Sequence, residues 1–334
     1  SRYDLKPVNM VSCSLFFTLF NAFADNKKYG IINQNNMKLK TFIAMGLLSM
    51  FSLGSCNAQQ KDNTAKKELH YTMNESAPKN YYLLTMSSNG CNFRILVNDI
   101  PVYGFWDEGT YSGSYPINHF IQKSGTQKLK VELYPAYTHE DLGINSEEPL
   151  YIEIKKRLDG QTLDDYVAVL TNPIPKVQKG IPYYEYECSF EAEVPYEITE
   201  LDELVDLSQE PNIEQQVVAK YNELKDMYEK KGFSAFQKQF DTRNKRIWVT
   251  NYIPINKGER DDNEDIERMK KFYKHVAPIQ NYEMRFFGDK KLVMLFSKED
   301  CTYAFRLYDG GSKMWAIPFF LGMRKGSDKL EIVF

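Results

Sequence analysis

Aromatic and acidic side chains are interspersed with glycines and serines in residues 104–115, which read GFWDEGTYSGSY. The aromatic rings could stack on a sugar or on a protein partner, and the carboxylates could accept hydrogen bonds. Because loops carry function disproportionately, this segment and the histidine that follows it supply the candidate ligand-binding residues: Trp106, Asp107, Glu108, Tyr111, Tyr115 and His119. The alternative interpretation is a long loop whose aromatic rings pack back on the edge of a sheet.

An acidic run in the C-terminal part has part of a calcium-loop pattern. Asp261, Asn263 and Asp265 match its first three ligand spacings, but the sixth position is Ile266 instead of glycine and the twelfth is Phe272 instead of glutamate. The calcium interpretation therefore fails. The run is better explained as negative charge at the start of a helix, where the helix dipole favours it.

Paired carboxylates at Glu185 and Glu187 raise the question of glycosidase chemistry, in which retaining pairs lie ~5 Å apart. Their alternation with aromatic and apolar residues instead indicates the solvated face of a strand. The sequence also lacks a nucleophile elbow, a phosphate-binding loop, a zinc-protease motif and a dinucleotide fingerprint. We therefore predict no catalytic residue, no metal ligand and no cofactor, which leaves an enzymatic function unsupported but open.

The amino-acid composition restricts which classes of molecule the protein can bind. Residues 1–56 hold six of the 42 Lys and Arg and two of the 45 Asp and Glu, so the rest carries 36 against 43, or about −7. A mildly acidic chain has no electrostatic footprint for nucleic acid. Cys91, Cys188 and Cys301 are odd in number and widely spaced, which indicates neither a disulfide framework nor a zinc site. We interpret Cys188 and Cys301 as buried thiols and leave open one bridge among the three.

Residues 79–197 have the pattern of an all-β domain. Short runs alternate apolar and polar residues, as in 128–134, 150–155 and 184–194, and turn residues such as Asn89-Gly90 separate them. Repeated alternation of period two predicts an antiparallel sandwich that is solvated on its outer faces.

The pattern changes at residue 198. Val217, Tyr221, Leu224 and Tyr228 recur at helical spacing, a short second helix follows Gly232, and residues 246–253 predict a strand. A third helix carries Ile266, Met269, Tyr273 and Val276, and strands return at 282–287, 291–296, 301–308, 313–320 and 329–334. Residues 198–334 thus predict an α+β domain whose helices pack on a curved antiparallel sheet. This element order weakly resembles NTF2-like domains, which enclose a pocket in a cone.

A charged head and a short apolar run precede these domains in residues 37–56, MKLKTFIAMGLLSMFSLGSC. The apolar run spans only ~18 Å as a helix, less than the ~30 Å hydrocarbon core, and suits a signal peptide. Its end, Leu53-Gly54-Ser55-Cys56, resembles the lipobox of bacterial lipoprotein precursors. The resemblance implies that Cys56 is lipidated, with palmitate among its acyl chains, and begins the mature protein. The polar residues that follow resemble the sorting region of Bacteroidetes-type lipoproteins.

These observations divide the chain into an upstream extension of non-native origin (1–36), a lipoprotein signal peptide (37–55), a flexible tether (56–78), the sandwich (79–197) and the α+β domain (198–334). The expected location is the bacterial cell envelope, lipid-anchored in the outer membrane, on its periplasmic or its surface face. We expect a non-enzymatic binding protein for a protein partner, such as an immunity or assembly factor. The alternatives are surface glycan binding through the 104–115 segment and an enzyme whose C-terminal pocket uses His275 and Tyr282.

Overall fold

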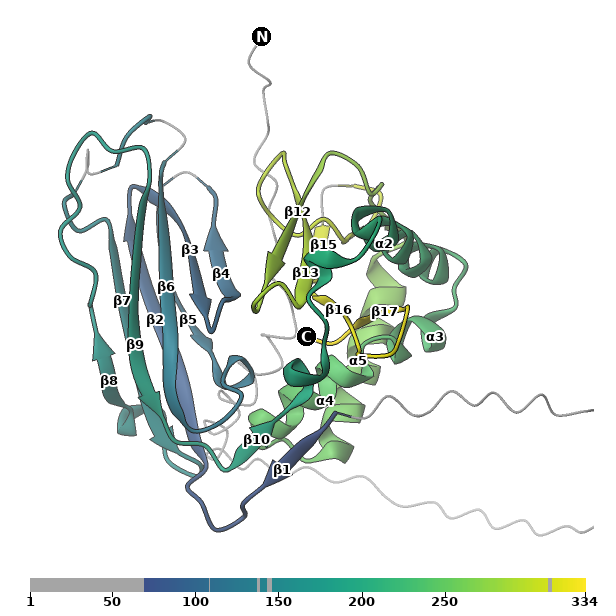
Figure 1. Ribbon diagram of the computed structural model, residues 1–334, viewed down its shortest axis with the longest axis horizontal. Coiled ribbons are helices and arrows are strands. Elements are labelled where there is room, and N and C mark those ends of the chain that lie inside the picture. The colour runs from purple at the N-terminus through teal and green to yellow at the C-terminus, as the bar shows by residue number, and fades with distance from the viewer. Residues whose placement is uncertain (1–68, 108, 137–138, 143–145, 312–313) are drawn as a thin grey trace, which may run out of the picture.

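Antiparallel sheets occupy one side of the molecule and helices with shorter strands occupy the other (Figure 1). The computed structural model describes residues 69–107, 109–136, 139–142, 146–311 and 314–334. Over these residues the fold is mixed α/β, with four α-helices and sheets in which every paired strand is antiparallel.

Two four-stranded sheets make up the N-terminal half. One has the strand order β5(Thr110–Pro116), β2(Asn80–Asn89), β7(Leu150–Leu158), β8(Val167–Thr171). The other has the order β4(Ile100–Phe105), β3(Cys91–Val97), β6(Gly125–Pro135), β9(Tyr184–Ala192). The short helices η2(Asn118–Phe120) and η3(Leu163–Asp165) lie in the connections.

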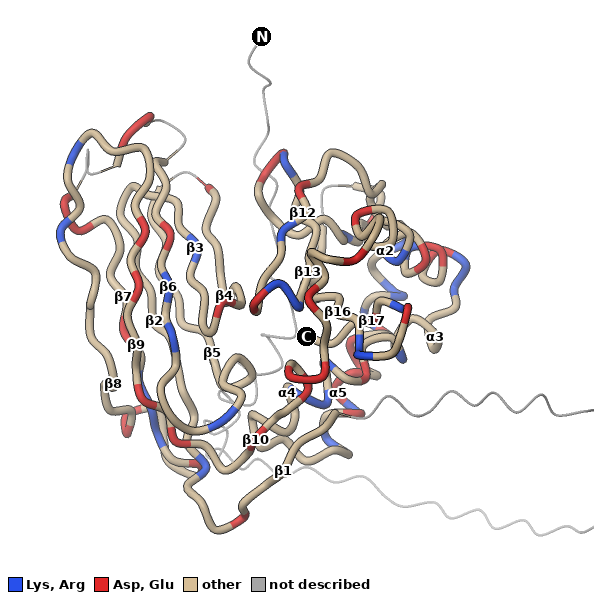
Figure 2. Tube along the Cα trace, in the orientation of Figure 1, with Lys and Arg blue, Asp and Glu red and all other residues tan. Residues whose placement is uncertain are grey.

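The alternation seen in the sequence sets which face of each strand is buried. Leu84 and Met86 of β2 are fully buried, as are Ile152 and Ile154 of β7 and Val131 of β6. Buried residues of both sheets belong to a single hydrophobic cluster. On the outer side β9 carries glutamates beside the lysines of β6 (Figure 2), and Lys130 Nζ lies 3.0 Å from Glu185 Oε2. The outer face of β6 and β9 is therefore charged, which is typical of antiparallel sheets, whereas β3 is buried on both faces.

The C-terminal half contains the four helices α2(Ile213–Glu229), α3(Phe233–Lys238), α4(Asp241–Thr250) and α5(Ile255–Phe272). Their sheet partners are β11(His275–Val276), β14(Arg306–Tyr308) and β15(Met314–Ala316), followed by β12(Tyr282–Phe287), β13(Leu292–Ser297), β16(Leu321–Met323) and β17(Leu330–Ile332). The predicted face of α2 is buried: Val217, Tyr221, Leu224 and Tyr228. The last strands are shorter than predicted, and the segment 301–305 is not a strand.

Two predictions for this half are wrong. The segment 246–253, predicted as a strand, belongs mainly to α4, in which Arg246, Val249 and Thr250 lie three and four residues apart and are all buried. Helix α5 begins at Ile255 after Pro254, six residues before Asp261, so the acidic run lies within the helix and not at its start. The element order that resembles NTF2-like domains thus contains a helix in place of its strand.

The end of the predicted tether is part of the fold. Leu69 is buried in the sheet cluster, and β1(Tyr71–Met73) pairs with β10(Tyr196–Ile198). The predicted boundary at residue 78 is therefore too late, because sheet pairing and burial already hold residues 69–73. Cys56 and the predicted segments 1–36 and 37–55 lie outside the described residues.

Buried side chains connect the two halves across residue 198. Val249, Phe296 and Phe334 belong to the same hydrophobic cluster as the sheet core. Short helices η4(Glu200–Glu203) and η5(Leu207–Gln209) lead from β10 into α2. The sequence pattern changes at residue 198, but the hydrophobic core continues across this point.

A buried ion network lies at this junction. Arg246 of α4 is fully buried and donates from Nη1 to Gln122 Oε1 at 2.6 Å, and its Nη2 faces Glu200 Oε2 at 3.8 Å. Arg324 donates from Nη2 to the other oxygen of Glu200 and from Nη1 to Glu203 at 3.0 Å. Residues from three parts of the chain thus neutralise one another inside the protein, and removing one partner leaves a buried charge.

Candidate functional site

The segment from Thr110 to Pro116 is strand β5, and its two tyrosines face other rings. Tyr103 stacks on Tyr111 at 4.8 Å and on Tyr115 at 4.5 Å between ring centroids, and the Tyr111 hydroxyl donates to the Tyr115 oxygen at 3.1 Å. The rings of Phe93 and Phe105 close this stack at 5.9 and 5.3 Å from Tyr111. Tyr111 and Tyr115 therefore pack against the sheet and offer little ring surface to a ligand.

Trp106 lies in a different group of side chains. Its ring is 4.9 Å from that of Tyr134 on β6, which is 5.2 Å from the ring of Tyr183. Trp106 and Tyr134 are half-buried, and Tyr183 is 41% exposed. Asp107 is exposed, and Glu108 lies outside the described residues. Trp106 is thus partly exposed, as Tyr111 and Tyr115 are, but its group of rings reaches the surface at Tyr183.

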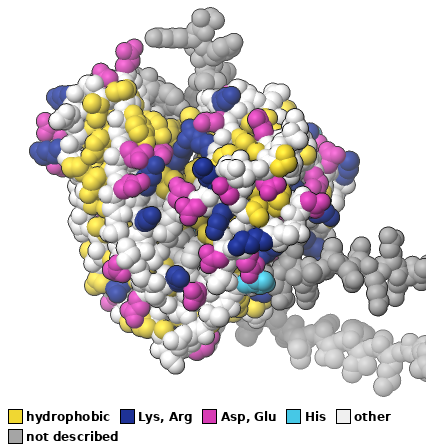
Figure 3. All heavy atoms as spheres, in the orientation of Figure 1, with side chains coloured by type: hydrophobic (Ala, Val, Ile, Leu, Met, Phe, Trp, Pro, Cys, Tyr) yellow, Lys and Arg dark blue, Asp and Glu magenta, His cyan; other side chains and the backbone are white. Residues whose placement is uncertain are grey.

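Two arginines complete this group. Arg94 of β3 is buried, with its guanidinium 5.1 Å from the ring centres of both Trp106 and Phe296. Arg285 of β12 lies 6.0 Å from the Phe296 ring and is two-thirds buried. We call Arg94, Trp106, Tyr134, Tyr183 and Arg285 the Trp106 cluster. It spans both halves of the molecule, along a boundary where charges of both signs meet hydrophobic side chains (Figure 3).

Carboxylates neutralise the cluster. Glu132 accepts from Tyr134 at 2.9 Å and from Arg94 at 3.3 Å, and Glu283 accepts two bonds from Arg285 at 2.8 and 2.9 Å. Burial, and then the positive charge of Arg285, lower the pKa of Arg94. The fixed ion pairs hold the aromatic rings in place and give the cluster little net charge.

His119 lies apart from the Trp106 cluster. It belongs to η2 and its ring is 4.1 Å from Phe120 and 6.2 Å from Phe334. Burial, followed by the positive charges of Arg246 and Arg243, lowers its pKa to about 3. A neutral, buried imidazole at the junction of the halves serves packing, so the structure separates His119 from the other predicted ligand-binding residues.

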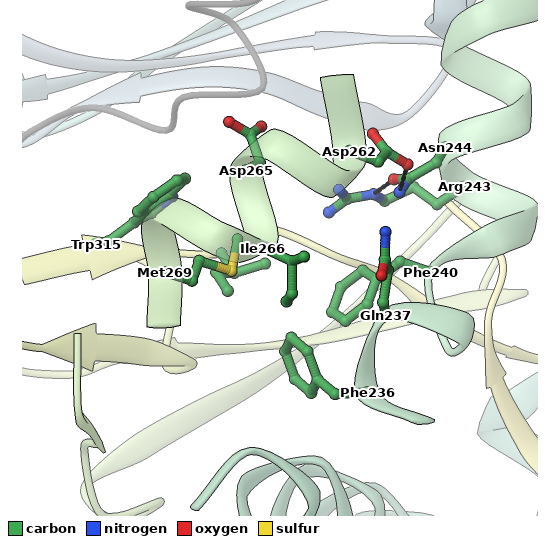
Figure 4. Close-up of a pocket in the computed structure, with 11 residues that line it drawn as sticks. Phe236, Gln237, Phe240, Arg243, Asn244, Asp262, Asp265, Ile266, Met269 and Trp315 are labelled. Carbon is green, nitrogen blue, oxygen red and sulfur yellow. Dashed lines mark hydrogen bonds between the residues drawn. The ribbon is translucent and has the colours of Figure 1, made fainter. Parts of the chain in front are cut away.

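A cavity of about 40 Å³ lies in the C-terminal half, among α3, α4, α5 and β15 (Figure 4). Its lining is apolar on one side and polar on the other: Phe236, Phe240, Ile266, Met269, Trp315 and Ile317 against Gln237, Arg243, Asn244, Asp262 and Asp265. His275 and Tyr282, which we named for a C-terminal pocket, do not line it. His275 instead packs 5.3 Å from the Tyr308 ring on β14.

The two carboxyl groups of the cavity are strongly perturbed. Burial raises the pKa of Asp262 to about 7 and that of Asp265 to about 6. Asn244 donates to Asp262 Oδ2 at 2.5 Å and accepts from Arg243 Nε at 3.0 Å. Carboxyl groups with raised pKa values in a cavity mark a candidate site. The lining residues come from segments that are far apart in the sequence, so only the acidic run around Asp262 signals this site there.

The pH dependence of stability tests this environment. A native pKa above the ordinary 3.8 means that the folded protein holds the Asp262 proton more tightly than the unfolded chain. This contribution to stability is present below pH 4 and is lost as the pH rises to about 7. We therefore expect Asp262→Asn, measured by urea unfolding, to gain stability relative to the wild type between pH 4 and pH 8.

Asp226→Asn is the matched control, because the hydrogen bond from Lys230 lowers the pKa of Asp226. Because its lowered pKa places the change below about pH 4, its stability relative to the wild type should stay nearly constant between pH 4 and pH 8. If both variants followed the same pH trend, the assignment of a raised pKa to Asp262 would be wrong.

Metal-ligating side chains and thiols are the other groups in the described residues that could carry chemistry. That part of the chain contains no group of three or more His, Cys, Asp and Glu placed to hold a metal ion. Its cysteines, Cys91, Cys188 and Cys301, are free thiols, and burial raises the pKa of each. None of its helices has the length and apolar character needed to cross a membrane.

Comparison with known proteins identifies no relative of this chain. No protein-family model matches this chain, and neither a curated protein nor a solved structure matches it.

Proposed function

We propose that this protein is an envelope lipoprotein, tethered through a lipidated Cys56, that binds a protein partner without catalysis. In this proposal the two N-terminal sheets form a sandwich domain that carries the binding surface, and residues from 198 onward form an α+β domain that supports it. The support for the anchor is the lipobox-like Leu53-Gly54-Ser55-Cys56 after a short apolar run. The proposed location is the outer membrane, with the face left open.

The Trp106 cluster is the observation that carries the binding role. Tryptophan, tyrosine and arginine are the residues that most often dominate binding energy at protein interfaces. Here they lie side by side, and ion pairs hold both arginines. Rings that are already fixed lose little conformational freedom when a partner binds. The surface is therefore prepared for a partner that covers Trp106 and Tyr183.

Glycan binding remains the second proposal, supported by the half-buried Trp106 ring. Two observations make it weaker than protein binding. The ring planes of Trp106 and Tyr134 are inclined by 54°, and so are those of Tyr134 and Tyr183, so they form no flat platform for a sugar. Tyr111, expected to stack on the same glycan, packs against Phe93 and Tyr103 instead.

An affinity pull-down from bacterial envelope extract tests the proposal, with the chain from Cys56 onward as bait and mass spectrometry as the readout. We expect one stoichiometric partner. Trp106→Ala should weaken its binding about 30-fold or more, since truncating a central anchor costs ~2 kcal/mol or more.

The matched control is Tyr151→Ala on the outer face of the other sheet, where Tyr151 is 39% exposed. This variant should bind like the wild type. Equal capture by the Trp106 and Tyr151 variants would place the interface elsewhere. An empty lane with the wild type, together with binding to a polysaccharide panel that depends on Trp106, would favour the glycan proposal.

A further inference from the structure

The cavity beside α5 is a site independent of the Trp106 cluster. About 40 Å³ is enough for roughly three water molecules, or for a ligand of similar size. Gln237 and Asp262 are its half-buried members, whereas Phe236, Phe240 and Trp315 are buried, so solvent reaches it from the polar side. Figure 4 shows Phe236, Ile266 and Met269 below the polar residues Asp262, Asn244 and Arg243.

Negative charge is in excess around this cavity. The carboxylates that act on one another there are Asp241 on α4 and Asp261, Asp262, Glu264 and Asp265 on α5, and the opposing cations are Arg243 and Arg268. Arg260 also lies 3.9 Å from Asp261, so three basic groups oppose five acidic groups and the excess is two. Helix α3, the residue before α4 and strand β15 contribute Phe236, Gln237, Phe240 and Trp315 to the cavity wall, and none of these is charged.

Arg243 is bonded outside the two carboxyl groups, whereas Arg268 is paired with one of them. Arg243 donates from Nη1 to the Pro318 carbonyl at 2.8 Å and from Nε to Asn244 at 3.0 Å, and it lies over the Phe240 ring. Arg268 reaches Asp265 at 3.3 Å from an exposed position. Asp262 receives its hydrogen bond from a neutral amide, Asn244. Asp262 therefore has no ion pair among the described residues, and a small cation in the cavity would supply a positive partner for it.

We propose that the cavity binds a primary alkylammonium group, with the ammonium at Asp262 and the short alkyl part against Met269 and Ile266. Aromatic faces attract such a cation, and Phe236, Phe240 and Trp315 line the same space. A Ca²⁺ or Mg²⁺ ion is a poorer fit, since it requires six or more oxygen ligands. The ammonium group comes either from a free small amine or from a lysine side chain of another polypeptide.

The test is an NMR titration of the full chain from Cys56 onward with ethylammonium, followed at the Met269 methyl and the Trp315 indole N–H. We expect saturable shifts at both groups and tighter binding at pH 8 than at pH 5, because Asp262 and Asp265 then carry charge. Ethanol, which has the same size and no charge, should cause no saturable shift. Nα-acetyl-lysine amide distinguishes the sources: binding by it assigns the site to a lysine side chain, and binding by ethylammonium alone assigns it to a free amine.

Asp262→Asn should weaken ethylammonium binding by about tenfold or more, and Glu259→Gln on the exposed face of α5 should leave it unchanged. A second readout does not depend on a variant: saturation with ethylammonium should lower the pKa of Asp262, followed by carboxyl ¹³C shifts in the wild type. Equal binding of ethanol and ethylammonium, or an unshifted Asp262 pKa at saturation, would overturn the proposal and leave a cavity that holds water.

Discussion

Replacing Arg246 with alanine is expected to destabilise the protein by about 3–5 kcal/mol, the usual cost of breaking a buried ion pair. Burial lowers the pKa of Arg246 to about 10, so the guanidinium is charged at neutral pH. The substitution removes the bond to Gln122, the charge facing Glu200 and the contact of the guanidinium with the Phe334 ring, 4.6 Å away. Single domains have only about 5–15 kcal/mol of stability, so this is a large fraction. Urea unfolding measures it.

Two further variants test whether the loss of stability comes from the buried ion network. Arg260→Ala removes an arginine whose side chain is 65% exposed, and it should change stability by less than about 0.5 kcal/mol. The double variant Arg246→Met with Glu200→Gln should lose less stability than Arg246→Ala, because methionine fills the space and the buried residue 200 carries no charge. Arg324 keeps its ion pairs with Glu203 and Glu331 in this variant. If Arg246→Ala unfolded at the same urea concentration as the wild type, the network would not connect the two halves energetically.

Replacing Cys56 with alanine is expected to release the full-length protein from membranes. The thiol is the proposed attachment point, and each buried methylene of an acyl chain contributes ~0.8 kcal/mol to membrane affinity, so two or three chains hold the protein firmly. Fractionation and metabolic labelling with palmitate measure the effect, and both the label and the membrane-bound fraction should be lost.

The control for this experiment is Cys91→Ala, which removes a buried thiol of β3 and should keep the palmitate label. Labelling that persisted in the Cys56 variant would contradict the lipoprotein proposal. It would leave the Trp106 cluster without an assigned location, and the pull-down would then be repeated with cytosolic extract as well.

The periodicity of apolar residues predicted strands and helices correctly where one face of the element is buried by apolar side chains. Alternation predicted β6, β7 and β9, and helical spacing predicted α2 with its buried residues Val217, Tyr221, Leu224 and Tyr228. It failed at α4, where the buried face carries Arg246 and Thr250. A face that is buried through ion pairs and hydrogen bonds gives no apolar periodicity, so the sequence offered no sign of a helix there.

The candidate sites show the same limit. Trp106, Tyr111 and Tyr115 are close in sequence, yet successive side chains of a strand point to opposite faces, and Trp106 precedes β5 while the tyrosines belong to it. The partners that matter, Arg94, Tyr134 and Arg285, come from three other strands. No spacing along the chain encodes these contacts.

The alternation of the β-rich half, the amphipathic α2 and the lack of known catalytic motifs can be read from the sequence, because they depend on residues a few positions apart. The tertiary structure alone decided that the two halves share a core, that Arg246 and Glu200 meet inside it, and that Asp262 and Asp265 face a cavity. Burial and charge pairing arise between distant segments, and only the folded chain brings those segments together.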